Sequence, residues 1–424
     1  MPFARPVEAL LIPSAIVLTI IDLWMIVDAF ETWRASSRPV PPPPRDHCYP
    51  AATAVIAAYL PNERAIIVPT VEYFLDELEY PGALCVMLAY NTPEALPVLA
   101  ELEAIVRREP RFRLLRVPDS TRKATNVNYA LRHVETPYVG VFDADSRPER
   151  SCFTKAAEHL GRGWDLVQGS AHVGVARNLW ERLNAVEMVL KFQVSYAARH
   201  TGFGMTYFCG KNGYWRTSAV RRAYSSEVAQ TEDVDMSLRA LLGGARLMFD
   251  PLLMLHEDAP PTFRAWWVQR VRWAEGWAQL VKWHLAPVFR SATVGPRCRA
   301  AWTYHLLGRR VVLPIAFVAF TLALATALLS GDGLSRYGAV AAGGRFGLQI
   351  LGTLAMGVTV LASAERRRTA PSFTLPALLA YASVVPFYDY LRCVTLVRGC
   401  AGFFHDPQRY VCTPRVAPEL RGIR

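Results

Sequence analysis

The stretch YVGVFDADSRP, residues 138–148, decides the fold of this chain. Its apolar part, 138–144, predicts a buried strand, and two carboxylates, Asp143 and Asp145, stand at its end. Residues two apart in an extended segment project to the same side. Two oxygen ligands placed in this way suit Mg²⁺ or Mn²⁺. Such a triplet also occurs by chance in many proteins, so the rest of the chain has to support a metal site.

A pattern of strand, turn and helix repeats between about residues 46 and 260. Strands that alternate with helices predict a mostly parallel sheet with helices on both faces. The predicted strands are 51–59, 84–90, 112–117 and 138–144, and the predicted helices are 62–78, 93–108 and 123–134.

Polar residues stand at the carboxyl ends of three of these strands. Glu63 follows the first, Asn91 follows the second, and Asp143 and Asp145 end the fourth. Ligands of open α/β sheets bind beyond the carboxyl ends of strands. We therefore expect these side chains to share a cleft, although ordinary turns explain each of them taken alone.

The segment TRKATNVNYAL, 121–131, places Lys123 and Asn128 at the start of a predicted helix. A helix N-terminus with a lysine favours phosphate or sugar hydroxyls. Helix capping and a solvated lysine are the simpler explanation of this segment by itself.

A second helix start carries three polar residues, Thr231, Glu232 and Asp233. Thr231 suits an N-cap, and acids in the first turn complement the helix dipole. That structural explanation needs no catalysis. The functional interpretation makes Asp233 a general base within reach of an acceptor hydroxyl.

The stretch 263–285 predicts an amphipathic helix in which tryptophan alternates with arginine. Its tryptophans are typical of a helix in the membrane interface; they are Trp266, Trp267, Trp273, Trp277 and Trp283. Within it, Gln269 and Arg272 are donors suited to a diphosphate. The ring of Trp273 suits the apolar face of a sugar.

Composition excludes several classes of protein. The 424 residues carry a formal net charge of +11 and are 52% hydrophobic, which favours an anionic membrane surface as the partner. No basic stripe with interleaved aromatics is present, so nucleic acid is not an expected partner. Eight cysteines without a CxxC pair argue against a zinc site and a disulfide framework.

Residues 9–30 are long and apolar enough to span a bilayer. Arginines follow this segment from Arg34 onward, which places its C-terminal end in the cytoplasm. Within it, Asp22 is expected to face a bundle interior or a polar conduit, and Asp28 to lie at the interface. The proline-rich run 40–45 is expected to be a stiff spacer.

Three more apolar candidates lie toward the end of the chain, at 311–330, 346–363 and about 373–391. Arginines at 366–368 mark a cytoplasmic loop between the last two. Two alternatives stay open for 373–391: Pro376 and Pro386 make it re-entrant, or the basic tail 392–424 is translocated.

The stretch 51–285 resembles the catalytic domain of inverting family 2 glycosyltransferases. It carries KATNVNYAL, VGVFDADSRP, FCG (208–210), TED (231–233) and QRVRW (269–273) in the family order. It is most similar to membrane-integrated members such as bacterial cellulose synthase catalytic subunits and their hyaluronan and chitin synthase relatives. The resemblance implies a Rossmann-like GT-A domain of α/β class in the cytoplasm, anchored in the plasma or bacterial inner membrane by N- and C-terminal transmembrane helices.

The resemblance also implies roles for residues. Asp233 is the catalytic base, and Asp145 with Asp143 holds the metal, Mg²⁺ or Mn²⁺. The implied substrate-binding residues are Glu63, Asn91, Lys123, Asn128, Asp143, Phe208, Cys209, Gly210, Glu232, Gln269, Arg272 and Trp273. Of these, Gln269 and Arg272 hold the pyrophosphate, and the FCG segment lines the acceptor sugar with Trp273.

The expected organisation has five parts. They are an N-terminal helix and linker (1–45), the GT-A domain (46–260), interfacial helices (261–310), a membrane region (311–391) and a basic tail (392–424). The tail segment YVCTPR, 410–415, resembles a motif that covers the active site in relatives, and a cytoplasmic tail favours the re-entrant alternative for 373–391.

One departure concerns the donor. The family carries an Asp-Asp-Gly turn that reads the nucleobase, and here Tyr90-Asn91-Thr92-Pro93 takes its place. A UDP-sugar remains the favoured donor, since an Asn can also hydrogen-bond a uracil edge. Three alternatives stay open for the product: extension of a polysaccharide, transfer of one sugar to a lipid, or a transporter or scaffold with a degenerate catalytic domain.

Overall fold

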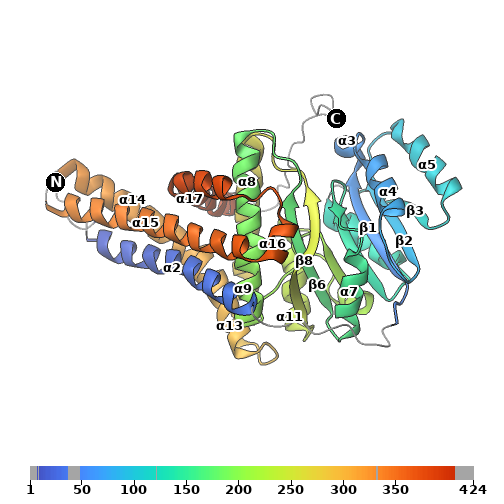
Figure 1. The fold of residues 1–424 in the computed structure, drawn as a ribbon, viewed down its shortest axis with the longest axis horizontal. Helices are drawn as coiled ribbons and strands as arrows, with labels where there is room; N and C mark the ends of the chain where they lie inside the picture. The colour runs from blue at the N-terminus through green and yellow to red at the C-terminus, as the bar shows by residue number, and fades with distance from the viewer. Residues whose placement is uncertain (1–6, 8, 37–47, 121, 331–332, 406–424) are drawn as a thin grey trace.

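The computed structural model describes residues 7, 9–36, 48–120, 122–330 and 333–405 (Figure 1). An α/β domain lies at one end of the molecule and an elongated bundle of helices at the other. The strands are β1 (Ala52–Tyr59), β2 (Leu84–Asn91), β3 (Phe112–Arg116), β4 (Tyr138–Asp143), β5 (Arg147–Pro148), β6 (Leu166–Val173), β7 (Gly213–Arg216) and β8 (Leu247–Glu257).

The helices of the α/β domain and its border are α3 (Leu60–Glu63), α4 (Ile67–Asp76), α5 (Val98–Arg108), α6 (Lys123–His133), α7 (Cys152–Gly161), α8 (Leu179–Val189), α9 (Ala197–Phe203), α10 (Thr217–Ala223), α11 (Glu232–Leu242), α12 (Phe263–Arg290) and α13 (Pro296–Thr303). Two π-helices interrupt this series, η1 (Leu190–Tyr196) and η2 (Tyr304–Val312). The remaining helices are α2 (Leu11–Ser36), α14 (Leu313–Ser330), α15 (Gly333–Ala362), α16 (Ala364–Thr369) and α17 (Leu375–His405).

The sheet has the strand order β3-β2-β1-β4-β7-β6-β8-β5. Four of its seven pairings are parallel, so the predicted mostly parallel sheet is confirmed. After β1 the chain builds β2 and β3 on one side and then returns to place β4 on the other. This reversal opens a crevice beyond the carboxyl ends of β1 and β4, where ligands of α/β sheets bind.

All four predicted strands are present, with ends that differ by at most one residue. The predicted helices differ more. The segment 62–78 is divided into α3 and α4, and the segment 93–108 becomes helical only after Pro97. A proline accounts for the later start of α5, because Pro97 occupies its N-cap. In α3, Pro61 lies in the first turn, a position that tolerates proline.

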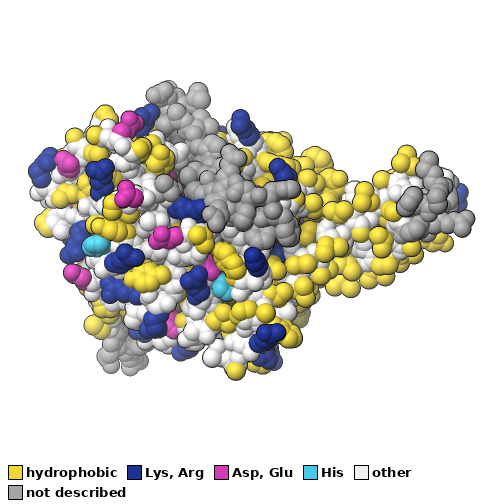
Figure 2. Space-filling model, turned by 180° about the vertical axis from the view of Figure 1, so that it is seen from behind, with side chains coloured by type: hydrophobic (Ala, Val, Ile, Leu, Met, Phe, Trp, Pro, Cys, Tyr) yellow, Lys and Arg dark blue, Asp and Glu magenta, His cyan; other side chains and the backbone are white. Residues whose placement is uncertain are grey.

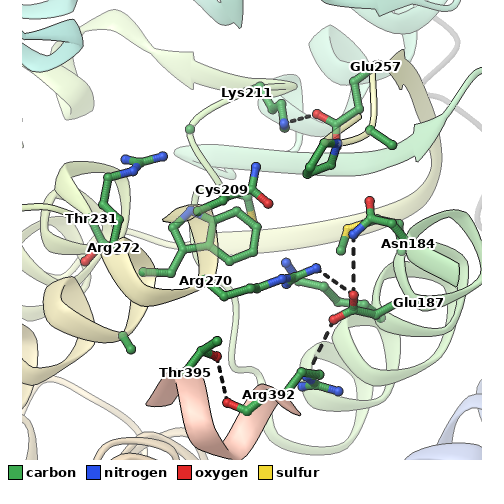
Figure 3. A pocket seen from close by; sticks show the side chains of 18 of the residues that line it. Asn184, Glu187, Cys209, Lys211, Thr231, Glu257, Arg270, Arg272, Arg392 and Thr395 are labelled. Atoms are coloured by element: carbon green, nitrogen blue, oxygen red, sulfur yellow. Dashed lines mark hydrogen bonds and ion pairs between the residues drawn. The ribbon is translucent and has the colours of Figure 1, made fainter. Parts of the chain in front are cut away.

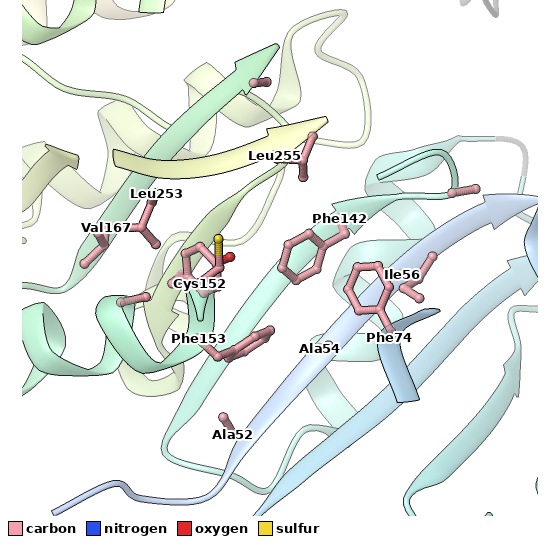
Figure 4. Close-up of a cluster of buried hydrophobic side chains, with 14 of the residues drawn as sticks. Ala52, Ala54, Ile56, Phe74, Phe142, Cys152, Phe153, Val167, Leu253 and Leu255 are labelled. Carbon is pink, nitrogen blue, oxygen red and sulfur yellow. The ribbon is translucent and has the colours of Figure 1, made fainter. Parts of the chain in front are cut away.

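Both faces of the central strands are buried. On one face, Phe142 packs edge-on against Phe74, with ring centres 4.9 Å apart, and against Tyr214 at 5.7 Å (Figure 4). On the other face, Val139 and Val141 join a second cluster around Trp215. Burial on both faces explains why these strands are continuous apolar runs rather than alternating ones.

The helical bundle consists of α2, α14 and α15, which lie side by side (Figure 1). Within the described residues, three helical stretches are long and apolar enough to cross a membrane: Leu11–Ala35, Pro296–Ser330 and Ser335–Ala362. They contain the predicted segment 311–330 and most of the segments 9–30 and 346–363. Hydrophobic side chains cover the visible face of this arm, whereas charges gather on the α/β domain (Figure 2).

The two acids of α2 are both buried. Asp22 accepts a hydrogen bond from Arg345 Nε of α15 at 3.0 Å, so it faces the bundle interior as expected. Asp28 is only 5% exposed and lies 3.9 Å from Arg199 of α9. Asp28 was expected at the membrane interface, and the structure instead places it inside the junction between bundle and α/β domain.

The segment 373–391 forms the first part of α17, which continues through Pro386 as one helix. A break at Pro386, the form expected for a re-entrant segment, is absent, and α17 is not among the three stretches above. Instead α17 packs on α12, where a Cβ at Gly399 would lie 2.4 Å from that of Ala274. The spacer 40–45 and the segment YVCTPR, 410–415, lie outside the described residues.

Two of the tryptophans expected in the membrane interface belong to the protein interior. Trp266 is 1% exposed and donates a hydrogen bond to the hydroxyl of Tyr388 at 2.8 Å, and Trp277 packs in the main core. Their helix, α12, is covered by α17 on this side. The sequence pattern of α12 was correct as an amphipathic helix, but a second helix rather than lipid covers part of its apolar face.

Replacing Phe142 with alanine is expected to lower the free energy of unfolding of the α/β domain by about 3–5 kcal/mol, because the change leaves a cavity between packed rings. Phe289→Ala, on a side chain that is 64% exposed, is the matched control and should change stability by less than about 0.5 kcal/mol. Chemical denaturation followed by circular dichroism measures both. Equal losses in the two variants would contradict this description of the core.

Candidate active site

A cavity of about 900 Å³ extends from the crevice at β1 and β4 to the helical bundle. Most of the residues singled out in the sequence line it. They are Glu63, Asn91, Lys123, Asp143, Asp145, Cys209, Gly210, Glu232, Asp233, Gln269, Arg272 and Trp273. The two carboxylates after β4, the helix start at α11 and the QRVRW segment of α12 therefore meet around one space.

Lys123 connects two walls of this cavity. Its Nζ lies 2.5 Å from Asp143 Oδ1 and donates to the carbonyl of Gly210 at 2.6 Å. Burial alone would lower the pKa of Lys123, but the carboxylates of Asp143 and Glu232 raise it above its usual value. The lysine is therefore a fixed positive charge between β4 and the FCG segment.

Lys211 is a second cation beside the same carboxylate. Its Nζ lies 3.8 Å from Asp143 Oδ2 and also forms an ion pair with Glu257 (Figure 3). Lys211 belongs to the FCGKNG segment, so its place next to FCG was the signal that could have identified it. Together Lys123 and Lys211 make this end of the cavity suited to a polyanion despite the acids nearby.

Asn91 lies in a hydrogen-bonded group of amides at the ends of β1 and β2. It donates through Nδ2 to the carbonyl of Ser120 at 2.7 Å and accepts from Asn126 Nδ2 at 2.7 Å. Asn126 also donates to the carbonyl of Ala58 at 3.1 Å. Asn126 also lines the cavity. It was not identified from the sequence, because Lys123 and Asn128 were singled out at the start of this helix instead.

Two predicted site residues lie outside the cavity. Asn128 donates to and accepts from the backbone of Ser225, at 2.8 and 2.9 Å, and so ties α6 to the loop before α11. Phe208 is 3% exposed and packs on Trp215 in the second core cluster. Both side chains are buried in the protein behind the wall, so the structure does not bring them to the cavity with the other predicted site residues.

The start of α11 brings Asp233 to the cavity. Burial, and then the neighbouring charge of Glu232, raise the pKa of Asp233 to about 7, although Lys123 opposes this change. Asp233 Oδ1 accepts from the backbone N–H of Val234 at 2.9 Å. Thr231 occupies the N-cap position as predicted, but its side chain makes no capping hydrogen bond. A carboxylate with a pKa near 7 is suited to proton transfer.

Gly210 lies next to Asp233 and has a backbone that only glycine adopts readily. Its φ is +82°, and a Cβ added there would lie 3.0 Å from Asp233 Oδ2 and 3.4 Å from Lys123 Nζ. The FCG segment thus passes directly beside the candidate base. Two residues of this segment, Cys209 and Gly210, line the cavity, and the backbone of Gly210 passes close to Asp233.

Close packing also fixes α12 against the start of α11. A Cβ at Gly276 would lie 2.5 Å from Thr231 Cγ2, so the two elements touch without an intervening side chain. On the same helix, Arg272 Nη1 lies 3.5 Å from the carbonyl of Gln230. Arg272 and Trp273 are therefore held at a fixed position relative to Asp233.

A buried group of charged residues joins α12 to α8 and α17. Glu187 of α8 accepts from Arg270 Nη2 at 2.6 Å and from the hydroxyl of Tyr388 at 2.7 Å, and Arg392 lies 3.6 Å away (Figure 3). Burial would raise the pKa of Glu187, but Arg270 and Arg392 lower it overall. Arg270 in turn lies 4.7 Å from the ring centre of Trp273.

Glu187 could not be found from the sequence, because no motif distinguishes it from Glu181, the other acid of α8. Arg270, by contrast, is part of QRVRW and could have been found there.

A metal fits the chemistry of the candidate donor set. Asp143 and Asp145 offer carboxylate oxygens at one end of the cavity, and the described residues contain no group of three or more His, Cys, Asp or Glu side chains able to hold an ion by themselves. Mg²⁺ and Mn²⁺ are often bound by one or two carboxylates together with water and phosphate oxygens. These acids therefore suit a metal that arrives with a diphosphate.

Comparison with solved structures defines the class of this fold. The structure is similar to that of the mannosyltransferase PcManGT from Pyrobaculum calidifontis, in complex with GDP-Man and Mn²⁺, with a TM-score of 0.58 and 21% identity. The match covers 90% of this chain and 99% of the other. The α/β domain therefore has the GT-A fold of glycosyltransferases.

A model of the glycosyl transferase family group 2 matches residues 138–383, more than half of the chain. The chain belongs to this family of glycosyltransferases. Glucomannan 4-beta-mannosyltransferase 1 of Oryza sativa subsp. japonica is 27% identical over 192 residues, which are 44% of this chain and 37% of that protein. Probable glucomannan 4-beta-mannosyltransferase 7 of the same plant is 27% identical over 252 residues, which are 56% of this chain and 43% of that protein. The chain thus spans about two fifths of the length of these relatives.

Gly210→Ala is expected to lower the rate of glycosyl transfer about tenfold to a hundredfold, because the added Cβ displaces Asp233 or Lys123. Gly204→Ala is a matched control: its φ is +69°, but nothing lies within 4 Å of an added Cβ. Both variants should lose about 1–2 kcal/mol of stability from the left-handed backbone. Transfer rates measured beside thermal unfolding separate the effects. Equal activity in the two variants would contradict a role for the Gly210 approach.

Proposed function

We propose that this chain is an inverting, metal-dependent hexosyltransferase that moves a sugar from a nucleoside diphosphate sugar to a growing saccharide at the membrane. One observation carries the proposal. Asp143, Asp145 and Asp233 open onto the same cavity as Arg272 and Trp273. Acids for a metal, cations for a leaving diphosphate, a base and a sugar platform therefore surround one space.

The donor occupies the end of the cavity at β4 in this proposal. Lys211 and Arg272 offer donors for the negative charge that develops on the departing nucleoside diphosphate. Asp143 and Asp145 would hold the divalent metal, which supplies further neutralisation of that charge when bound. The related proteins are named for mannose, and PcManGT holds GDP-Man, so GDP-mannose is the first donor to test, followed by UDP-sugars.

The nucleobase would lie beyond the sheet near Asn91. Both polar ends of the Asn91 amide already bond to Ser120 and Asn126. Asn91 therefore fixes the positions of Ser120 and Asn126 in the cavity wall. An Asp at this position would bring a negative charge that these amides lack. This difference supports a base preference distinct from that of relatives with the Asp-Asp-Gly turn.

Asp233 acts as the base in this proposal. It accepts the proton of an acceptor hydroxyl as that oxygen attacks the anomeric carbon from the face opposite the diphosphate, so the configuration inverts. Trp273 orients the acceptor ring, and the cations Arg270 and Lys191 lie 4.7 and 5.2 Å from the centre of its ring.

The membrane orientation follows from the basic residues. Arg366 of α16, in the connection between α15 and α17, donates to the carbonyl of Gln193 in η1, so this connection docks on the border of the α/β domain. Arginine-rich loops remain in the cytoplasm. We therefore place the catalytic domain on the cytoplasmic side of the plasma or bacterial inner membrane.

Asp233→Asn is expected to reduce transfer by about a hundredfold or more, because the amide cannot accept the proton, while donor binding persists. Radiolabelled transfer from GDP-mannose and UDP-sugars in membranes measures the rate, and binding of the nucleotide measures the donor site. Asp76→Asn, at an exposed residue of α4 outside the cavity, is the control.

Substantial transfer by Asp233→Asn would refute the base assignment. The absence of nucleotide release from every sugar donor by the unaltered protein would favour the scaffold alternative. Sizing of the labelled product separates a polymer from transfer of a single sugar to a lipid.

The pH dependence of kcat/KM should show an inflection near pH 7, with the rate rising toward higher pH. The raised pKa means that Asp233 keeps its proton below about pH 7, and a protonated carboxyl cannot accept another. Glu232→Gln removes a charge that raises this pKa, so the inflection should move to lower pH. An inflection that Glu232→Gln leaves in place would assign it to a different group.

A further inference from the structure

Beyond Trp273, the cavity continues to the junction with the helical bundle, and basic side chains line it there. We call this part the basic pocket, formed by Lys191, Arg199, Arg309 and Arg310. Lys191 comes from η1, Arg199 from α9, and the other two from η2. These elements meet where the α/β domain ends and the bundle begins (Figure 1).

Three of the four cations lie over aromatic rings. Lys191 Nζ lies 5.5 Å and Arg199 Cζ 6.0 Å from the ring centre of Tyr196. Arg310 Cζ lies 4.0 Å from the ring centre of Trp277, and its Nη2 is 3.2 Å from His305 Nε2. The four cations are also close enough to His305 to interact with it electrostatically. They therefore form one pocket rather than four separate surface charges.

Positive charge in the basic pocket exceeds the negative charge available to it. Among the described residues, Asp28 is the one carboxylate at ion-pair distance, 3.9 Å from Arg199. Arg310 Nε is buried and has no hydrogen-bond partner in the described part of the chain. Burial lowers the pKa of Lys191 to about 8, as expected for a cation with too few partners. Buried charge without a partner is costly, so the pocket is built for an anion.

The backbone gives an independent indication of function. Lys191, Arg309 and Arg310 lie on π-helices, which are rare and frequent at functional sites. Two such segments, 114 positions apart from Leu190 to Tyr304, face the same cavity. Regular α-helices would rotate these side chains away from their present directions.

The location of the basic pocket indicates the kind of anion. η2 leads directly into α14, whose exposed Ile315, Val318 and Leu322 belong to a stretch long and apolar enough to cross a membrane. The pocket therefore lies where a lipid head group meets protein. In the proposed function the diphosphate of the donor has other cations, Lys211 and Arg272.

We propose that the basic pocket binds the phosphate of a lipid-linked saccharide acceptor. Its sugar then lies on Trp273 and its reacting hydroxyl faces Asp233. Trp273 and Trp277 are one helical turn apart, about 6 Å, so phosphate and sugar occupy adjacent positions along α12. The phosphate site stands on the geometry of the pocket, and the sugar position rests on the proposed function.

Binding tests the phosphate site directly. Dodecyl phosphate, dodecyl glucoside and inorganic phosphate are titrated by calorimetry into the full chain in a neutral detergent. Dodecyl phosphate should bind at least about tenfold more tightly than either of the other two, because it alone combines anion and chain. Arg310→Gln should weaken its binding about tenfold, and Arg310→Lys, which keeps the charge, should restore most of it. Arg368→Gln, at an exposed arginine of α16, is the matched control.

Several results would overturn the inference. Equal binding of dodecyl glucoside would exclude recognition of the phosphate. Equal binding of inorganic phosphate would assign the pocket to a free anion. Equal affinities of Arg310→Gln and Arg368→Gln, in samples with the same unfolding temperature, would place the phosphate elsewhere.

A second experiment, which measures sugar transfer, distinguishes this inference from the proposed function. Dodecyl phosphate that carries one hexose is compared with dodecyl glucoside as acceptor, and KM for the phosphate-bearing acceptor should be about tenfold lower. Phosphate-specific binding without transfer to either acceptor would refute the proposed function and leave the phosphate site intact. Equal KM values would show that the phosphate makes no contribution during transfer.

Discussion

The partly buried charge of Lys123 holds the two halves of the candidate active site together. It joins Asp143 at the end of β4 to the carbonyl of Gly210 beside Asp233. A buried ammonium group needs such partners, because its own desolvation is unfavourable. The positions of Asp143 and of Asp233, the proposed metal ligand and the proposed base, are therefore not independent. Any movement of the FCG segment changes the surroundings of both.

The sequence predicted the central strands well and the cavity wall in part. Apolar runs ending in Asp143, Asn91 and Glu63 gave strands and their carboxyl ends, because burial on both faces leaves a continuous pattern. Phe208 and Asn128 lie behind the cavity wall for a physical reason. Asn128 bonds to Ser225, 97 positions away, and Phe208 packs in a cluster that includes Val139 and Met236, so local spacing contains no record of either environment.

The same limit explains the residues that were missed. Glu187 and Lys191 belong to a helix without a motif, and only the folded chain brings them to α12. Trp266 shows the reverse error: its pattern matched a membrane interface, whereas α17 covers it through Tyr388. Amphipathic periodicity identifies an apolar face but does not tell whether lipid or another helix covers that face.

The close contact of Gly276 with Thr231 has a consequence for how the enzyme senses its surroundings. On one side α12 touches the segment that carries Asp233, and on the other it packs on α17 at Gly399. No flexible side chain separates the layers at either contact. A displacement of α17 is therefore passed through α12 to the segment that carries Asp233. The packing on one side of α12 becomes a mechanical variable of the candidate active site on the other.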